Sequence, residues 1–288
     1  MTQRPFRFYA TVMDFFADII LGVIQGLTEF LPVSSSGHLA AGQLLMQRLG
    51  TEASLAADSM MFEVLLHLAT LLAVVIFYRR EALAALVSLP RIFRALPAGT
   101  LRQCIDDDED ARRLLAIAVA TVPTAILGLL LRHWAGAAGQ HAAALGGLFL
   151  LCAVMLAATR FAPIGTRALT MKAALLIGIV QGLAVFPGIS RSGATIACAL
   201  ALGIPREEAA RFSFLLSIPA ILGAAVFEVQ PAALLEMPSL APLLLGTLAA
   251  FLVGLAALRL LVYIVRRGHL WSFAPYVALV GLACVVFL

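Results

Sequence analysis

The sequence predicts an all-α polytopic membrane protein, built as an inverted-topology repeat with about six full transmembrane helices and two re-entrant helical hairpins. Three features support this prediction: the composition, the length of the apolar runs, and a polar motif that occurs twice. Hydrophobic residues make up 62% of the 288 residues and charged residues 12%, whereas a soluble domain carries about 25% charged residues. We expect a single integral membrane domain over 1–288, because no long polar linker divides the chain.

The apolar runs have lengths near the ~20 residues that a helix needs to cross a bilayer. They are apolar on every side, so lipid is their expected surroundings, in contrast to the one-sided helices of a soluble bundle. The six clear runs are 60–78, 114–131, 141–158, 212–229, 241–264 and 271–288.

The repeated motif divides the chain into repeat one, 1–158, and repeat two, 159–288. Gly22-Val-Ile-Gln-Gly-Leu27 matches Gly178-Ile-Val-Gln-Gly-Leu183, and each copy continues through Phe and Pro into a tip rich in Ser and Gly. Self-similarity of this kind indicates a duplicated architecture. A further match joins Phe62-Glu-Val-Leu-Leu66 to Phe212-Ser-Phe-Leu-Leu216, each followed by an apolar span.

Each tip interrupts an apolar segment, 22–49 in the first repeat and 173–203 in the second. Because neither arm is long enough to span alone, we predict a helix, an irregular tip at membrane depth, and a second helix. Irregular backbone at that depth requires protein or a wet cavity around it. Three spans plus one hairpin per repeat would invert the second repeat, and inverted repeats bring broken helices together near the midplane. We therefore expect the two tips to meet.

The basic residues indicate an orientation. Fourteen of the 20 Lys and Arg residues fall in the predicted inside segments and four in the outside segments, as the positive-inside rule requires. Both termini would then face outward. The arginines are spread over short loops, so nucleic-acid binding is excluded. The inside segments are 79–113, 159–172, 203–211 and 265–270, expected as loops.

Glu29 and Arg191 are ionisable residues within the two interrupted segments. Such a residue costs roughly 2.5–3.5 kcal/mol at the centre of a membrane helix, so it indicates a functional site. The alternative is a buried ion pair that only holds the repeats together. That alternative leaves the hydroxyls and glycines around both residues unexplained.

Those hydroxyls and glycines suit the binding of an oxyanion. Glycine N–H groups can approach a phosphate closely, and the second arm of each hairpin would point its N-terminus at the anion. The guanidinium of Arg191 adds a planar fork that matches phosphate oxygens. The predicted substrate-binding residues of the tips are Ser34, Gly188, Ser190, Ser192 and Thr195.

His38 ends the first tip, directly after three serines and a glycine. We predict a catalytic role for it, as nucleophile or as general acid and base. His67 is a weaker candidate, because it follows Glu63 by four residues and such a pair usually makes a local hydrogen bond on one helix.

At these residues the chain resembles the undecaprenyl pyrophosphate phosphatases of the bacitracin-resistance type. The first signature reads Gln25-Gly-Leu-Thr-Glu29-Phe-Leu-Pro-Val-Ser-Ser-Ser-Gly-His38, and the second reads Pro187-Gly-Ile-Ser-Arg-Ser-Gly-Ala-Thr195. Both are long and in the expected order, and the resemblance covers nearly the full chain.

The resemblance implies hydrolysis of undecaprenyl pyrophosphate to undecaprenyl phosphate and inorganic phosphate, which recycles the lipid carrier of cell-wall synthesis and confers bacitracin resistance. It also implies a divalent cation, Mg²⁺ or Ca²⁺, and a site that opens to the outer, periplasmic side of the bacterial inner membrane. The functional positions that it implies are Glu29, Ser34, Ser35, His38, Ser190, Arg191 and Thr195.

Gln25 departs from the family pattern, because many members have Glu there. An amide carries no charge, so Gln25 is expected to bind or orient the substrate, and Glu29 remains as the candidate metal ligand together with phosphate oxygens and water. The nucleophile stays open between His38, Ser35 and a metal-activated water. Ser35 or His38 acting with Glu29 is favoured, because a hydroxyl and an imidazole lie close in one tip.

Two other functions fit the same features. Inverted repeats with broken helices also occur in transporters, so a transporter or flippase of a polyprenyl phosphate lipid is the main alternative, and a structural membrane subunit is the second. The expected partners are the polyprenyl pyrophosphate lipid and the bilayer, and a homodimer is left open. The four cysteines have no paired spacing, so neither a disulfide framework nor a zinc site is expected.

Overall fold

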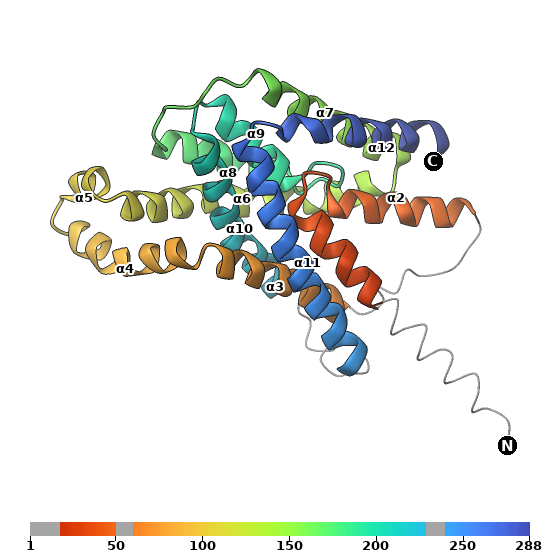
Figure 1. Cartoon of the computed structure of the whole chain (residues 1–288), viewed down its shortest axis with the longest axis horizontal. Helices are drawn as coiled ribbons and strands as arrows, with labels where there is room; N and C mark the ends of the chain where they lie inside the picture. Colours follow the sequence, from red (N-terminus) through yellow and green to blue (C-terminus); the bar gives the residue numbers. More distant parts are fainter. Residues whose placement is uncertain (1–17, 50–59, 229–239) are drawn as a thin grey trace.

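The computed structural model describes residues 18–49, 60–228 and 240–288, and within these ranges all regular secondary structure is helical (Figure 1). The first described helix covers 18–30. The others are α2 (Ser35–Arg48), α3 (Met60–Phe77), α4 (Arg79–Ala95), α5 (Leu101–Asp107), α6 (Glu109–Gly139), α7 (Ala142–Ala158), α8 (Met171–Leu183), α9 (Arg191–Ala201), α10 (Arg206–Glu228), α11 (Leu240–Arg266) and α12 (Ala274–Phe287), with short 3₁₀ turns η1 (Thr159–Phe161) and η3 (Leu270–Phe273).

Five of the six predicted spans lie in described helices that are long and apolar enough to cross a membrane. The sixth, 60–78, forms α3, whose apolar stretch Val64–Phe77 belongs to the shorter apolar helices. The prediction of an all-α polytopic membrane protein is therefore confirmed. The five long stretches are Glu109–Gly139, Ala142–Phe161, Arg206–Val226, Leu243–Arg266 and Leu270–Phe287.

Two helical hairpins occupy the interrupted segments. Helix 18–30 pairs with α2, and α8 pairs with α9, each through a short irregular tip. The arms α2, α8 and α9 have 14, 13 and 11 residues. At ~1.5 Å per residue they measure roughly 16–21 Å, which is shorter than the ~30 Å hydrocarbon core. These lengths agree with re-entrant arms.

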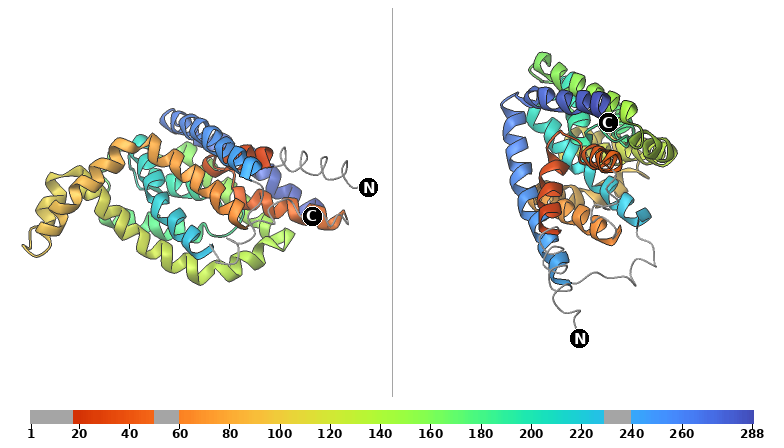
Figure 2. Two further views of the ribbon diagram at one scale, coloured as in Figure 1. Left: turned by 90° about the horizontal axis from the view of Figure 1, so that it is seen from below. Right: turned by 90° about the vertical axis from the view of Figure 1, so that its right-hand side faces the viewer.

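The first arm of each hairpin packs against a span of the other repeat. Helix 18–30 lies beside α11 (Figures 1 and 2), and a Cβ added to Gly22 would lie 2.1 Å from the carbonyl oxygen of Gly246. In the second repeat, a Cβ on Gly178 would lie 2.2 Å from the carbonyl oxygen of Ala120 in α6. Matched glycines thus permit matched close approaches. The reciprocal packing of each first arm against the other repeat supports two related repeats. Their inversion in the membrane stays a prediction.

The segment 79–113, expected as a loop, is mostly helical, and this expectation was wrong. It forms α4, α5 and the start of α6, which extend from one end of the bundle (Figure 1). The acidic run explains part of the difference, because Asp108 caps α6 by accepting hydrogen bonds from the backbone N–H groups of Asp110 and Ala111. Acidic residues in a first helical turn also interact favourably with the helix dipole.

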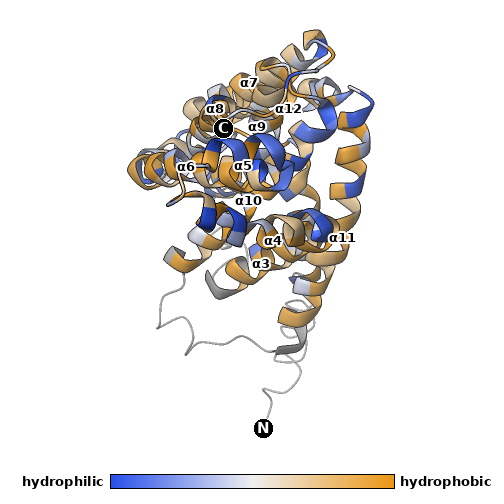
Figure 3. Cartoon of the chain, turned by 90° about the vertical axis from the view of Figure 1, so that its left-hand side faces the viewer, coloured by the Kyte–Doolittle hydropathy of each residue, from blue (hydrophilic) through white to orange (hydrophobic). Residues whose placement is uncertain are grey.

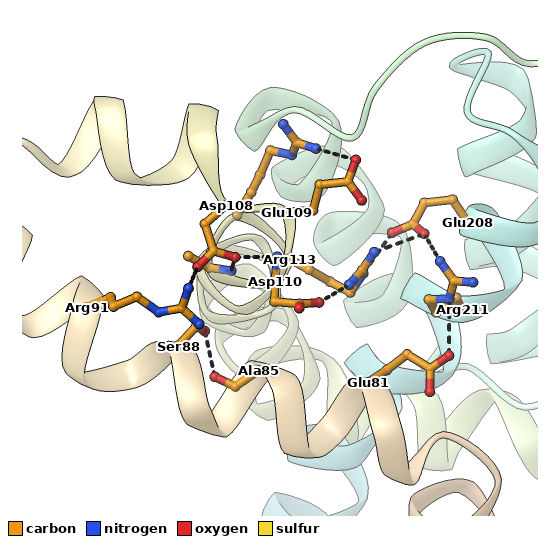
Figure 4. A network of polar contacts seen from close by, with 12 residues as sticks. Glu81, Ala85, Ser88, Arg91, Asp108, Glu109, Asp110, Arg113, Glu208 and Arg211 are labelled. Atoms are coloured by element: carbon orange, nitrogen blue, oxygen red, sulfur yellow. Dashed lines mark hydrogen bonds and ion pairs between the residues drawn. The ribbon is translucent and has the colours of Figure 1, made fainter.

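Charged side chains at this end join the two repeats (Figure 4). The buried Arg113 of α6 pairs with Asp110 at 2.8 Å and with Glu208 of α10 at 2.9 Å. Arg211 of α10 pairs in turn with Glu208 at 2.8 Å and with Glu81 of α4 at 3.6 Å. Seen from the α5 end, hydrophilic residues gather here while the sides of the long helices are hydrophobic (Figure 3). The distribution fits the predicted inside face.

Candidate active site

The two tips are in direct contact, as the repeat predicted. The Oγ of Ser34 in the first tip accepts a hydrogen bond from the backbone N–H of Gly188 in the second, at 3.0 Å. In return, the Oγ of Ser192 donates to the carbonyl oxygen of Phe30 at 2.9 Å. All four groups are buried. Each hairpin therefore fixes the position of the other.

Ser34 holds an unusual backbone conformation. Its φ is 68°, and it is the one non-glycine residue with positive φ in the described part of the chain. Such a conformation costs of order 1–3 kcal/mol and persists where surrounding contacts determine it. Here the Oγ also accepts from the N–H of Gly37 at 3.3 Å, and the carbonyl oxygen lies 2.9 Å from Nδ1 of His38. These bonds place the N-terminus of α2 directly after the tip.

Glu29 is buried, with 9% of its surface exposed, and it is surrounded by polar groups. Gln25, one turn earlier on the same helix face, donates from Nε2 to Oε2 of Glu29 at 3.1 Å. The Oγ of Ser35 donates to the same oxygen at 3.5 Å, and Nε2 of His67 lies 3.9 Å from it. The other oxygen, Oε1, pairs with the guanidinium of Arg191.

Arg191 joins the second tip to this carboxylate. It is the first residue of α9, and its N-cap Ser190 accepts a hydrogen bond from the N–H of Gly193 at 3.2 Å. About a quarter of the Arg191 side chain, 26%, is exposed, against 5% for Glu29. The guanidinium therefore neutralises the buried carboxylate and still presents a charged surface to the space above it.

That space is a cavity of about 190 Å³. One side is polar and comes mainly from the two tips, where the first residues of α2 and α9 line it. The opposite side is apolar and comes mainly from α10. Clustered N–H groups at helix N-termini favour anions, so the cavity suits a ligand with an anionic head and an apolar body. It is lined by Thr28, Glu29, Ser34, Ser35, Ser36, His67, Ala184, Ile189, Ser190, Arg191, Ala220, Ile221, Ala224 and Ala225.

Residues 18–283 match the sequence model of the family described as bacitracin resistance protein BacA. The chain belongs to this family. It is 44% identical to the undecaprenyl-diphosphatase of Desulfatibacillum aliphaticivorans over 273 residues, which cover 93% of this chain and 96% of the relative. The undecaprenyl-diphosphatases of Desulforapulum autotrophicum and Korarchaeum cryptofilum are each 40% identical, covering 95% and 94% of this chain and 98% of each relative.

The structure gathers most of the predicted site residues, although their roles stay predictions. Glu29, Ser34, Ser35, Ser190 and Arg191 line the cavity, and Gln25 reaches it through its bond to Glu29. The remaining predicted binding residues lie behind the cavity wall. Gly188 and Ser192 bond the opposite tip, and the fully buried Thr195 donates to the carbonyl oxygen of Arg191 at 2.8 Å. These three are placed to shape the tips.

His38 is not placed with Glu29, contrary to the expectation that they share one site. Its Nε2 lies 2.8 Å from the hydroxyl of Tyr276 in α12, and the two rings stack with centroids 5.7 Å apart. Its Nδ1 is engaged by the carbonyl oxygen of Ser34. Both ring nitrogens are thus held outside the cavity, so the imidazole is placed to support the Ser34 backbone.

His67 takes the place in the cavity that the sequence suggested for His38. The structure places its Nε2 3.9 Å from Oε2 of Glu29. The side chain of Glu63, the expected partner of His67 in a local hydrogen bond, lies outside the described residues. The repeat contained the signal that would have identified His67. In the match of 62–66 with 212–216, the next position is His67 in one repeat and Ser217 in the other, and Ser217 also adjoins the Glu29–Arg191 pair.

The donor atoms around Glu29 fit a hard cation only in part. In the described ranges, no group of three or more His, Cys, Asp and Glu side chains could hold a metal ion. Glu29 nevertheless offers carboxylate oxygens and Ser35 a hydroxyl oxygen beside them, whereas Gln25 turns its amide nitrogen toward Glu29. Mg²⁺ commonly binds one or two carboxylates and completes its shell with phosphate oxygens and water. A cation would therefore fit here together with a phosphate ligand.

Proposed function

We propose that this protein hydrolyses undecaprenyl pyrophosphate to undecaprenyl phosphate and inorganic phosphate in the cavity between the two tips. The observation that carries the proposal is the Glu29–Arg191 pair, which places a carboxylate and a guanidinium at the base of a cavity with one anion-binding side and one apolar side. The names of the relatives agree with this reaction.

Binding of the pyrophosphate would use Arg191 and the N-termini of α2 and α9. Phosphoryl transfer depends chiefly on positioning and on stabilisation of charge on the phosphoryl oxygens. Arg191 supplies a permanent positive charge, and the helix N-termini supply N–H groups in a site that the apolar wall shields from water. The bridging oxygen and the lipid chain would then lie toward α10.

Ser35 is the favoured nucleophile, because its hydroxyl donates to Glu29 while the ring nitrogens of His38 are engaged elsewhere. The Oγ of Ser35 attacks the terminal phosphorus, Glu29 accepts its proton, and the bond to the bridging oxygen breaks to release undecaprenyl phosphate. After that proton passes to solvent, Glu29 takes a proton from an attacking water. The Oγ–P bond breaks, the proton returns to Ser35, and phosphate leaves. Direct attack by water is the competing route.

A divalent cation, Mg²⁺ or Ca²⁺, is part of the proposal. Glu29, with Gln25 and Ser35 beside it, would hold the cation together with pyrophosphate oxygens, and the cation would neutralise charge on the phosphoryl groups. Chelation by EDTA should then abolish turnover, and added Mg²⁺ or Ca²⁺ should restore it. Full turnover in EDTA would remove the cation from the proposal.

We place the site near the outer face of the bacterial inner membrane. α10 begins at Arg206, at the end with the ion-pair network, and the cavity-lining residues 220–225 follow 14 to 19 positions later. At ~1.5 Å per residue this is roughly 21–28 Å along the helix. With the basic end inside, the cavity lies in the outer half. Impermeant phosphatase substrates added to intact cells would test this orientation.

The decisive experiment measures phosphate release by the purified protein in detergent with undecaprenyl pyrophosphate. We expect release by the wild type and loss of release in Glu29→Gln. A folded wild type that releases no phosphate from any polyprenyl pyrophosphate would sink the enzyme proposal. It would favour a transporter or flippase, for which the interlocked re-entrant hairpins are also suited.

A further inference from the structure

A second cavity adjoins the first. It has a volume of about 380 Å³ and lies between α6, α8 and α10. Four residues line both cavities, namely Ala184, Arg191, Ala220 and Ala224. The guanidinium of Arg191 therefore stands at the junction, with the polar tip cavity on one side and the second cavity on the other. We call the second cavity the α6–α10 groove.

The polar groups of the α6–α10 groove are few: Arg132, Arg191 and Gln181, whose Oε1 has no hydrogen-bond partner among the described residues, and two threonines. The hydroxyl of Thr121 donates to the carbonyl oxygen of Ile117 at 2.7 Å, and the hydroxyl of Thr124 donates to that of Ala120 at 2.8 Å. Most of the remaining wall is apolar, with Leu129, Val185 and Pro219 among its members. Its volume is within the usual range of about 300–1,000 Å³ for pockets that bind small apolar ligands.

We infer that this groove binds the first isoprene units of the substrate's polyprenyl chain. The inference rests on the proposed function. A pyrophosphate held by Arg191 has its lipid chain attached at the point where the two cavities join, so the chain can continue into the groove without crossing a polar surface. A chain that left on the other side would pass the tip hydroxyls and Glu29, where burial of apolar groups gains nothing.

Two glycines leave the groove wide. Gly128 of α6 and Gly223 of α10 both line it, and a Cβ added to either would meet no atom within 4 Å. Neither glycine therefore serves close helix packing, in contrast to Gly182 of α8, where an added Cβ would lie 2.7 Å from Cβ of Leu127. A glycine within a helix costs about 1 kcal/mol relative to alanine. Groove width is the property that these two glycines provide.

The same geometry gives a clean steric test. Gly128→Leu and Gly223→Leu would project side chains into the groove from two walls, and the Cβ of each would have open space around it. Gly136→Leu is the matched control, because Gly136 is also in α6, an added Cβ there also meets nothing within 4 Å, and it lines neither cavity. Each variant would be compared with wild type by kcat/KM on prenyl pyrophosphates of increasing length, from dimethylallyl to undecaprenyl.

For wild type and Gly136→Leu, we expect kcat/KM to rise with chain length until the groove is filled. For the two groove variants the rise should disappear, with a loss of about tenfold or more on undecaprenyl pyrophosphate and no loss on dimethylallyl pyrophosphate. If a leucine variant fails to fold, Gly128→Ala and Gly223→Ala should show a smaller effect in the same direction.

Two results would overturn the inference. An unchanged chain-length profile in the groove variants would mean that the chain lies elsewhere and that bulk membrane lipid occupies the groove. An equal loss on every substrate, with a lowered melting temperature, would mean that the glycines support the fold and do not accommodate the chain. Absence of hydrolysis by wild type on all substrates would instead reject the proposed function, so the two failures are distinguishable.

Discussion

Glu29 and Arg191 are 162 positions apart in the sequence and form one ion pair across the contact between the two hairpins. Each repeat contributes one charge, so neither repeat contains the pair by itself. The side chain of Glu29 is 5% exposed and that of Arg191 is 26% exposed, so the two groups have different roles. The carboxylate holds Gln25 and Ser35 by hydrogen bonds at the cavity, and the guanidinium faces the ligand.

Arg191→Lys separates charge from geometry. Lysine keeps the positive charge beside Glu29, so we expect the melting temperature in detergent to remain within a few degrees of wild type. It lacks the planar fork that can bind two phosphate oxygens, so kcat/KM should fall by about 10²-fold or more. A lysine variant with normal turnover and a lowered melting temperature would show that the pair only holds the repeats together.

Ser35→Ala tests the nucleophile. The neighbouring Ser36→Ala is its matched comparison, because both serines line the cavity and it is the hydroxyl of Ser35 that donates to Glu29. We expect Ser35→Ala to lower kcat by about 10³-fold or more and Ser36→Ala to have a much smaller effect. A phosphoserine trapped by acid quenching of wild type would support attack by Ser35. Near-normal kcat in Ser35→Ala would favour direct attack by water.

The sequence predicted the helical spans, the hairpins and the meeting of the tips, because these follow from hydropathy and from an internal match such as Gly22–Leu27 with Gly178–Leu183. It also brought Glu29 and Arg191 together, because two costly charges at matched depth in a membrane require each other or a ligand. The length of each apolar run and the alignment of the two repeats are visible in the sequence itself, so they can be predicted without knowledge of the tertiary structure.

The directions of individual side chains could not be predicted in this way. His38 follows the tip serines in sequence, but its imidazole hydrogen-bonds to the hydroxyl of Tyr276, 238 positions away, and does not line the cavity. The helical state of 79–113 was also missed, because its arginines and Pro90 resemble a solvated loop, whereas contacts with α6 and a capping aspartate stabilise the helices. The direction of His38 depends on a partner that is distant in sequence, and the helices of 79–113 depend on packing between neighbouring elements and on a local cap.

His38→Asn distinguishes a supporting role from a catalytic one. An asparagine amide can still donate to the carbonyl oxygen of Ser34, in place of Nδ1, but it cannot act as a nucleophile or transfer a proton as imidazole does. We expect His38→Asn to retain substantial kcat and His38→Ala to lose far more, with Tyr276→Phe causing a mild loss. If His38→Asn proves as inactive as Glu29→Gln, the imidazole itself takes part in the reaction.

His67→Ala is expected to lower kcat by about 10²-fold, within the usual contribution of a general acid or base. The reason is the 3.9 Å separation between its Nε2 and Oε2 of Glu29, in a cavity that both residues line. KM should change little, because Arg191 and the helix N-termini hold the pyrophosphate. A rise in KM with unchanged kcat would instead assign His67 to substrate binding.

Ser34→Ala and Ser34→Gly separate the contribution of the Ser34 hydroxyl from the strain of its positive φ. Both remove the Oγ that accepts hydrogen bonds from Gly37 and Gly188, and loss of a cap of this kind costs about 0.5–2 kcal/mol. Glycine relieves the strain of the positive φ, whereas alanine keeps it. We therefore expect the melting temperature in detergent to be highest for wild type, lower for Ser34→Gly and lowest for Ser34→Ala. Both should lose turnover, because the tips no longer fix each other. An alanine variant more stable than the glycine variant would mean that the tip relaxes out of the φ of 68° once the hydroxyl is gone.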